Sequence, residues 1–173
     1  MNTMTPVPAL ETLPGRELDR DELERIAATL AGDPASWHPH ASHDAAERHF
    51  ALAHRDEHVE VYVISWQPGH DTGFHDHGVS AGAFAIASGQ LTEERLRLDG
   101  PSFSRVLAAG ESAAFSPAAI HRVRHAGGEP AVSVHVYSPP LAALGTYAAG
   151  VDGELERHQV EADAELRPRA ATA

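Results

Sequence analysis

Three histidines of this chain, His75, His77 and His121, have the spacing expected of a metal site. Residues two apart on a β-strand point to the same face of a sheet, so the first two histidines would face one way and Asp76 the other. His121 follows several predicted strands later, and a meander or jelly roll returns the chain beside its starting strand. The three imidazoles would then converge on one ion, at the usual distance of about 2.0–2.2 Å.

The residues around these histidines distinguish the pattern from chance, because a lone HxH carries little weight in a chain with 13 histidines. Pro68-Gly69 precedes the pair and Gly89 follows it, and Gly110-Glu111 and Pro117 precede the third histidine. The two segments, PGHDTGFHDHGVSAGAFAIASG and GESAAFSPAAIHRV, resemble the two motifs of the cupin superfamily. Those motifs are a glycine-anchored HxH hairpin and a later hairpin with Gly, Pro and His.

The resemblance to the cupins covers about Val61 to Ser138 and implies an all-β fold, a cupin (jelly-roll) β-barrel. Many cupins add a glutamate ligand a few residues after the HxH. The matching stretch here, Gly78 to Gly82, has no carboxylate, and the next acidic residue is Glu93, past the hairpin turn. The predicted site therefore consists of three neutral histidines.

Three neutral imidazoles leave a divalent metal ion with its full +2 charge and with open coordination positions. Such a centre favours anionic ligands, above all a thiolate, and a soft sulfur donor suits iron(II). Iron can also bind and reduce dioxygen, whereas zinc has no redox chemistry. We therefore expect Fe(II) as the cofactor, with zinc as the alternative metal.

The strand after the third histidine, AVSVHVYSPP from Ala131 to Pro140, alternates between two faces. One face carries valines, and the other carries Ser133, His135 and Tyr137. In one interpretation the valines face the core and the polar residues face water. In a barrel with a polar cavity the assignment reverses, and Ser133 and His135 hold the Tyr137 hydroxyl toward the metal. Such a hydrogen-bonded row can position a substrate and pass a proton.

This strand is similar to the Ser–His–Tyr strand of the cysteine dioxygenase family, the thiol dioxygenases within the cupins. The Trp66-x-Pro-Gly segment, HDHG, His121-Arg122-Val123 and SVHVYSPP match that family at consistent spacing. The closing SPP resembles the family's cis-proline segment, so Ser138-Pro139 is expected to be cis. The matching segments cover most of the predicted barrel.

The resemblance implies a reaction and a set of site residues. Iron(II) on the three histidines would bind a small thiol as the thiolate, and both atoms of dioxygen would be transferred to sulfur to give a sulfinic acid. Tyr137, His135 and Ser133 would be the catalytic residues, which hold the substrate or dioxygen and manage the proton. Trp66 and Phe115 are expected to belong to the core or the pocket wall.

Two positions depart from the family. Gly82 stands where the eukaryotic members have a cysteine bonded to the tyrosine, and the chain has no cysteine, so no such cross-link can form. The cysteine-specific members hold the substrate carboxylate with an arginine, and in the matching segment, residues 48–53, that position is apolar here. Arg48 and Arg122 are the candidates to bind substrate in its place; the alternative is a substrate that does not present its carboxylate there.

These observations predict an iron(II)-dependent thiol dioxygenase that acts on cysteine or a related small thiol. Three alternatives remain at this point. The protein is a cupin enzyme with a non-sulfur substrate, a non-catalytic cupin that binds a small ligand, or a structural barrel whose histidines bind no metal.

The composition limits the other classes of partner. The chain has 25 acidic and 13 basic residues, for a net charge of −12, so neither nucleic acid nor an anionic membrane is an expected partner. No apolar run reaches the roughly 18 residues of a membrane span. The first residues lack the basic and apolar regions of a secretory signal, which predicts a cytoplasmic protein. We expect a monomer or a small homo-oligomer.

Local patterns divide the chain into an N-terminal arm and helix over residues 1–47, a barrel over 48–162 and a frayed tail over 163–173. Apolar spacing predicts a helix from Glu17 to Leu30, ended by Gly32, and a helical turn at Ala35–His38. Short β-rich runs separated by turn residues then predict an antiparallel sandwich or barrel, and LGTYAAG and LERHQVE predict an edge hairpin. The runs are HFALAH, HVEVYVISW, DTGFHDH, GAFAIASG, QLTEERLRL, FSRVLAA, ESAAFSP, IHRVRHAG and AVSVHVYS.

Overall fold

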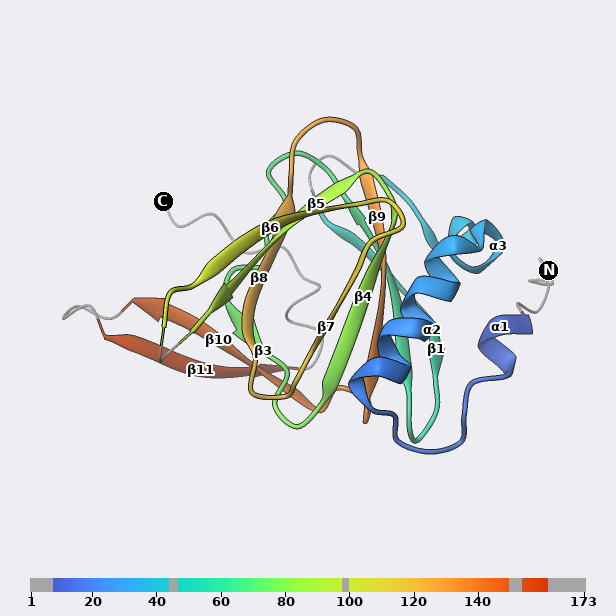
Figure 1. Cartoon of the computed structure of the whole chain (residues 1–173), viewed down its shortest axis with the longest axis horizontal. Coiled ribbons are helices and arrows are strands. Elements are labelled where there is room, and N and C mark those ends of the chain that lie inside the picture. The colour runs from blue at the N-terminus through green and yellow to red at the C-terminus, as the bar shows by residue number, and fades with distance from the viewer. Residues whose placement is uncertain (1–7, 44–46, 98–99, 150–153, 162–173) are drawn as a thin grey trace.

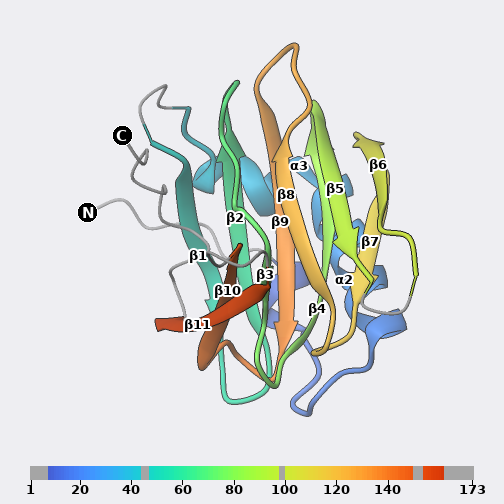
Figure 2. The same ribbon diagram turned by 90° about the vertical axis from the view of Figure 1, so that its left-hand side faces the viewer.

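The protein forms two antiparallel β-sheets that face each other, with helices on the outer side of one of them (Figure 1). The structure is a computed structural model that describes residues 8–43, 47–97, 100–149 and 154–161. Figure 2 views the molecule from the side of the second sheet, so that the helices lie behind the first. The expected all-β architecture with a short N-terminal helical segment is confirmed.

Neighbouring strands in the described part of the chain pair antiparallel in both sheets. The first sheet has the order β1 (His49–Arg55), β2 (Glu60–Trp66), β9 (Ala131–Ser138), β4 (Ala81–Ser88) and β7 (Ser112–Phe115). The second sheet has the order β11 (Leu155–Glu161), β10 (Ala143–Ala149), β3 (His75–Asp76), β8 (Ile120–His125), β5 (Gln90–Leu96) and β6 (Phe103–Ala108).

The central strands of the first sheet, β2 and β9, are buried on both faces. Their outward-facing small and branched side chains, such as Val134, pack against α2 (Arg20–Gly32). Their inward-facing side chains, such as Trp66 and Tyr137, pack in the barrel interior with residues of the second sheet such as Val123. Every residue of β9 is therefore buried, although the strand alternates between apolar and polar residues.

This arrangement decides between the two interpretations of the strand after the third histidine. The valines of β9 contact the helix side, so Ser133, His135 and Tyr137 face the barrel interior. The interpretation in which the polar residues face water is wrong. The reason is that α2 supplies a second apolar surface, which the strand pattern by itself does not reveal.

Helix α2 begins three residues later than the apolar spacing predicts. Asp19 caps it: its side chain accepts a hydrogen bond from the Glu22 N–H at 2.9 Å, and the Glu22 carboxylate accepts one from the Asp19 N–H at 3.1 Å. This capping box fixes the start of the helix. Gly32 is the last helical residue and Asp33 the C-cap, so the predicted glycine cap lies one residue too early.

Short helical turns flank α2. α1 (Pro8–Glu11) lies in the segment that we predicted to be an unpatterned arm, and α3 (Pro34–Trp37) matches the predicted turn after the glycine. A 3-10 turn, η1 (His38–His40), leads from α3 toward the barrel. Within the described residues, no helix is both long and apolar enough to cross a membrane.

The strand that carries the histidine pair is much shorter than predicted. The run DTGFHDH contributes only His75–Asp76, because Gly73 and Gly78 adopt positive φ angles of 68° and 62° that interrupt the extended backbone. His77 therefore lies just beyond the strand. The predicted edge hairpin is present as β10 and β11, and the residues predicted to form a frayed tail lie outside the described part of the chain.

Candidate metal centre

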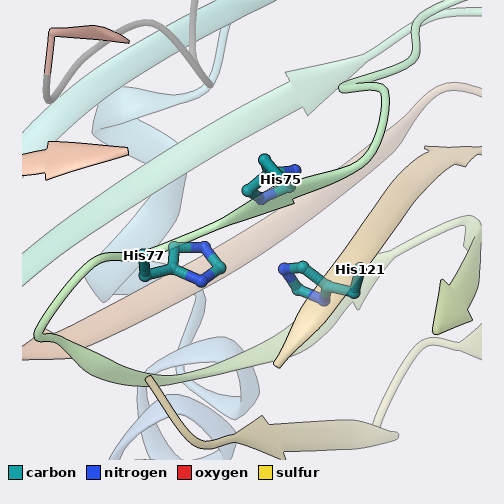
Figure 3. Close-up of side chains that lie close together, drawn as sticks. All are labelled: His75, His77 and His121. Carbon is teal, nitrogen blue, oxygen red and sulfur yellow. The ribbon is translucent and has the colours of Figure 1, made fainter. Parts of the chain in front are cut away.

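The three predicted metal ligands lie together inside the barrel (Figure 3). His75 of β3 pairs with His121 of β8 across the second sheet, and His77 follows from the end of β3. All three side chains are buried. Their ring centroids are 4.7 to 5.1 Å apart, and one nitrogen from each ring lies within 4.8 Å of the others.

The neighbours of two rings determine which nitrogen faces the centre. Nδ1 of His75 lies 3.0 Å from the carbonyl oxygen of Gly73, and Nδ1 of His121 lies 3.0 Å from Oε1 of Glu93. Both partners are acceptors, so each Nδ1 carries a hydrogen and each Nε2 carries the lone pair that a metal binds. Among the described residues, the buried Nε2 of His121 has no hydrogen-bond partner.

This donor set fits a divalent transition metal. Two imidazole nitrogens on one ion at about 2.1 Å are at most about 4.2 Å apart, so small ring rotations suffice to close the site. Burial lowers the pKa of His121 to about 3, and the Glu93 hydrogen bond offsets only part of that effect. His121 is therefore neutral near pH 7, the form that ligates metal.

Glu93, which lies too far along the chain from the HxH pair to be predicted as a ligand, nevertheless contacts the site. It is fully buried on β5, and its carboxylate accepts hydrogen bonds from His121, from Arg95 Nε at 2.8 Å and from Arg105 Nε at 2.9 Å. Burial alone would raise the pKa of Glu93, but the bonds from His121 and Arg95 lower it to about 2. A carboxylate therefore stands directly behind one of the three ligands.

Asp76, between the two ligands of the HDH segment, points away from the centre as the strand alternation predicts. Its carboxylate accepts bonds from Tyr147 Oη at 2.6 Å, from Arg157 Nε at 2.7 Å and from the Gly78 N–H at 2.9 Å. Burial by itself raises the pKa of Asp76, but these bonds outweigh it and hold that pKa well below its ordinary value. The C-terminal hairpin thereby anchors the ligand segment.

Glycine is required where this anchor forms. A Cβ atom at Gly145, which pairs with Asp76, would lie closer than 3.0 Å to the side chains of Arg157 and Asp76. The absence of a side chain at this position gives the guanidinium access to the carboxylate.

The polar residues of β9 form one hydrogen-bonded row. Ser133 Oγ lies 2.8 Å from His135 Nε2, and His135 Nδ1 lies 3.2 Å from the Tyr137 hydroxyl. Trp66 extends the row, because its Nε1–H donates to Ser133 Oγ at 2.9 Å. At the other end, the Tyr137 ring centroid is 5.3 Å from that of His77. The row thus leads to the three histidines. The Ser138-Pro139 bond that follows is cis, as expected.

Phe115 occupies the space beside Gly82. Its ring stacks on His77 with centroids 4.4 Å apart and lies 4.6 Å from His121. A Cβ atom at Gly82 would lie closer than 3.0 Å to the Phe115 ring and 2.9 Å from Cδ1 of Tyr137. The position at which the eukaryotic family members carry cysteine therefore has no room for a side chain here.

The two arginines predicted to bind substrate have different surroundings. Arg48 is 3% exposed, and its guanidinium carbon lies 5.0 Å from the ring centroid of Trp66. Arg122 adjoins His121 on β8 and so points to the opposite, outer face, where its Nε donates to Asp71 at 2.9 Å. The structure does not bring Arg122 to the three histidines.

The sequence is similar to those of known cysteine dioxygenases, in agreement with the three-histidine site. The model of the family cysteine dioxygenase type I matches residues 3–149. Cysteine dioxygenase type 1 of Homo sapiens is 27% identical over 137 residues, which cover 73% of this chain and 68% of the human protein. The same enzyme of Rattus norvegicus is 27% identical over 143 residues, which cover 76% and 70%.

Solved structures agree on the fold. An uncharacterised conserved protein from Klebsiella pneumoniae with a double-stranded β-helix domain superposes with a TM-score of 0.55 at 20% identity, over 62% of this chain and 84% of that one. The double-stranded β-helix is the cupin barrel, so the expected fold class is confirmed. The resemblance to the cysteine dioxygenase family, inferred from the sequence motifs, is confirmed by the family match.

The first prediction concerns the ligands. His77→Ala removes one of three nitrogen donors, so we expect iron bound during anaerobic loading to fall from near one per chain to well below stoichiometric amounts. Elemental analysis measures this directly. His158→Ala, on the exposed strand β11, is the control and should load like the unmodified protein. Undiminished iron in His77→Ala contradicts the assignment.

The second prediction concerns the packing beside the centre. Gly82→Ala forces a methyl group against Phe115 and Tyr137, so we expect the free energy of unfolding to fall by about 1–3 kcal/mol. Urea denaturation of the metal-free protein measures the loss. Gly32→Ala, where a Cβ atom meets nothing within 4 Å, serves as the control. Equal stability of the two variants would show that the Phe115 ring moves aside without cost.

Proposed function

We propose that this chain, which belongs to the cysteine dioxygenase type I family, is an iron(II)-dependent thiol dioxygenase that oxidises cysteine or a related small thiol to its sulfinic acid. The reaction, RSH + O2 → RSO2H, adds both oxygen atoms to sulfur. The electrons that sulfur loses equal those that dioxygen gains, so no further reductant is required. A cytoplasmic location, as expected from the sequence, completes the proposal.

The observation that carries the proposal is the inward-facing row of β9 that ends beside the histidines. A barrel with a purely structural role has no need to bury Ser133, His135 and Tyr137 in contact with one another, because burying polar groups is costly. Placed next to three neutral imidazoles, the row supplies a hydroxyl at the point where a metal would bind its substrates.

The metal supplies what the side chains lack. Iron(II), when bound, provides the orientation and the redox chemistry that neither histidine nor tyrosine has. His75, His77 and His121 would hold it as neutral ligands. Zinc fits three imidazoles equally well but cannot exchange electrons, so the two metals are distinguished by turnover.

The tautomer of His135 decides the proton direction along the row. The indole N–H of Trp66 donates to Ser133 Oγ. With the His135 hydrogen on Nδ1, the Ser133 hydroxyl donates to His135 Nε2 and His135 donates to the Tyr137 oxygen, which is the direction that the proposed function needs. In the proposed function the Tyr137 hydroxyl acts as the proton donor toward the substrate or dioxygen.

Aromatic side chains close the centre on its other sides. The Phe115 ring covers His77, and the Phe84 ring lies 5.2 Å from His135 and 6.3 Å from His121. Both phenylalanines are fully buried. Such a wall keeps water away from a thiolate and from the reacting oxygen atoms, and it strengthens the polar interactions that remain.

Arg48 packs its buried guanidinium against Trp66, at the end of the row opposite Tyr137 and the three histidines. Neither of the two arginines predicted to bind substrate therefore lies beside the candidate metal centre. The family's carboxylate-binding arginine position is apolar, so a thiol panel has to vary the carboxylate as well as the amine.

The proposal is tested by oxygen uptake. Protein loaded anaerobically with iron(II) is mixed with cysteine, with a mercapto acid that lacks the amine, and with an aminothiol that lacks the carboxylate. We expect uptake with at least one thiol, one dioxygen consumed per sulfinate formed, and no uptake by the zinc-loaded protein. Oxygen electrode and mass spectrometry measure the two quantities.

Three results would contradict the proposal. Tight binding of a thiol without oxygen uptake would instead support a ligand-binding cupin. Uptake that requires a non-sulfur substrate would support a different cupin enzyme. A sulfenic or disulfide product would also count against it, because it leaves one or both oxygen atoms off the sulfur.

A further prediction concerns Tyr137. Tyr137→Phe removes only the hydroxyl, so we expect unchanged iron content and a turnover number reduced on the order of 10²-fold, the usual contribution of a positioned proton donor. Tyr62→Phe is the matched control. Tyr62 is also buried, with its ring centroid 6.5 Å from that of Tyr137, but its hydroxyl donates to Glu60. Full turnover in Tyr137→Phe would remove the tyrosine from the mechanism.

A further inference from the structure

The surroundings of the three histidines are not equivalent. Nδ1 of His75 contacts a neutral backbone carbonyl, that of Gly73, whereas Nδ1 of His121 contacts the carboxylate of Glu93. A carboxylate that accepts the Nδ1 hydrogen increases electron density on the imidazole and fixes the orientation of the ring. This difference makes His121 a stronger electron donor to a bound metal than His75.

Glu93 is held in this position from two further sides. Arg95 and Arg105 donate to its two oxygens, and Arg105 is the more exposed of the two arginines, with 39% of its side chain accessible against 20% for Arg95. A buried carboxylate is costly unless it is paired, and these arginines provide the pairing. Both carboxylate oxygens are therefore used, and Glu93 has little freedom to leave His121.

The cluster also connects the two sheets. Arg95 Nη2 donates to the backbone carbonyl of Ala114 on β7 at 2.8 Å. The next residue, Phe115, stacks on His77. The contacts of Glu93 therefore extend from His121 in the second sheet to β7 in the first sheet, whose Phe115 packs on the ligand His77.

We propose that Glu93 is a positioning residue of the metal centre: it replaces, through His121, part of the negative charge that a carboxylate ligand would supply, and so sets the iron affinity and the iron(III)/iron(II) potential. The inference rests on the proposed function for the identity of the metal. Glu93 acts through His121 and does not touch the substrate.

The test compares Glu93→Gln with Glu94→Gln. Glutamine keeps the size and one acceptor oxygen of Glu93 but removes the charge. Glu94 is the neighbouring carboxylate on the opposite face of β5, where it pairs with Arg124 at 2.7 Å and with Arg122 at 3.6 Å. The measurements are iron(II) affinity by competition with a chelator, the midpoint potential, and the electron paramagnetic resonance spectrum of the iron(II)–nitric oxide adduct.

We expect Glu93→Gln to weaken iron(II) binding by about 10- to 100-fold. The midpoint potential should become more positive, because the iron(III) state loses the nearby negative charge, and the spectrum should change. Glu94→Gln should match the unmodified protein in all three measurements. Equal values for the two glutamine variants would overturn the proposal.

A second variant changes the charge in the opposite direction, so the test remains possible if the Glu93→Gln protein does not fold. Arg105→Gln removes a positive charge at the exposed end of the cluster and leaves the bond between Glu93 and His121 in place. We expect its midpoint potential to become more negative than that of the unmodified protein. A positive shift, or none, would show that the cluster has only a structural role.

These measurements are independent of turnover. If no thiol is oxidised but the two charge variants shift the potential in opposite directions, the proposed function fails and the role of Glu93 stands. If thiols are oxidised and the potential does not respond to either variant, the role of Glu93 fails and the proposed function stands.

Discussion

The pairing of His75 with His121 across β3 and β8 is the contact on which the site depends. β3 is only two residues long, so its own ladder cannot hold it. Two further contacts do so: the second sheet continues through β10, where Gly145 and Thr146 pair with the strand, and the Asp76 carboxylate receives Arg157 and Tyr147. A ligand strand that is flanked on both sides and bonded on its outer face has little freedom, and preorganised ligands bind metal more tightly.

Polar groups that are buried in the barrel need hydrogen-bond partners, because water cannot reach them. In the row of β9, each member from Trp66 to Tyr137 has a partner within the row. The Glu93 carboxylate has two arginines and a histidine as partners. The row also packs against an aromatic ring, since Phe84 stacks on His135. Hydrogen bonds buried in this way are stronger than in water and more costly to break.

The sequence predicted the parts of this design that depend on spacing. The histidine ligands are predictable because HxH in extended backbone turns both imidazoles to one face, although His77 lies just past the end of β3. The strand segments are predictable because turn residues separate them. The direction of the β9 row was not decidable, since alternation defines two faces and only the packing of α2 shows which one is inside. Arg122 was misplaced as a substrate residue although alternation already sets it opposite His121.

Glu93 and Arg157 were missed for a different reason. The strand QLTEERL is so charged that it suggests a solvent-exposed face, yet Leu91, Glu93 and Arg95 lie on one face, and Leu91 is fully buried. A charged residue two positions from a buried leucine was the available signal. Arg157 offered none, because its partner Asp76 is distant in sequence and lies in the first half of the chain.

The position of the carboxylate connects these observations. Where many cupins have a glutamate ligand, the stretch from Gly78 to Gly82 has no carboxylate here, and Phe115 fills the space beside Gly82. A ligand carboxylate would lower the net positive charge of the metal centre and occupy a coordination position. Glu93, placed behind His121, offers negative charge while occupying none, and Arg95 and Arg105 limit how much of it reaches the centre. In the proposed function both consequences matter, because the thiolate and dioxygen each need an open position and the thiolate needs a metal that still carries positive charge.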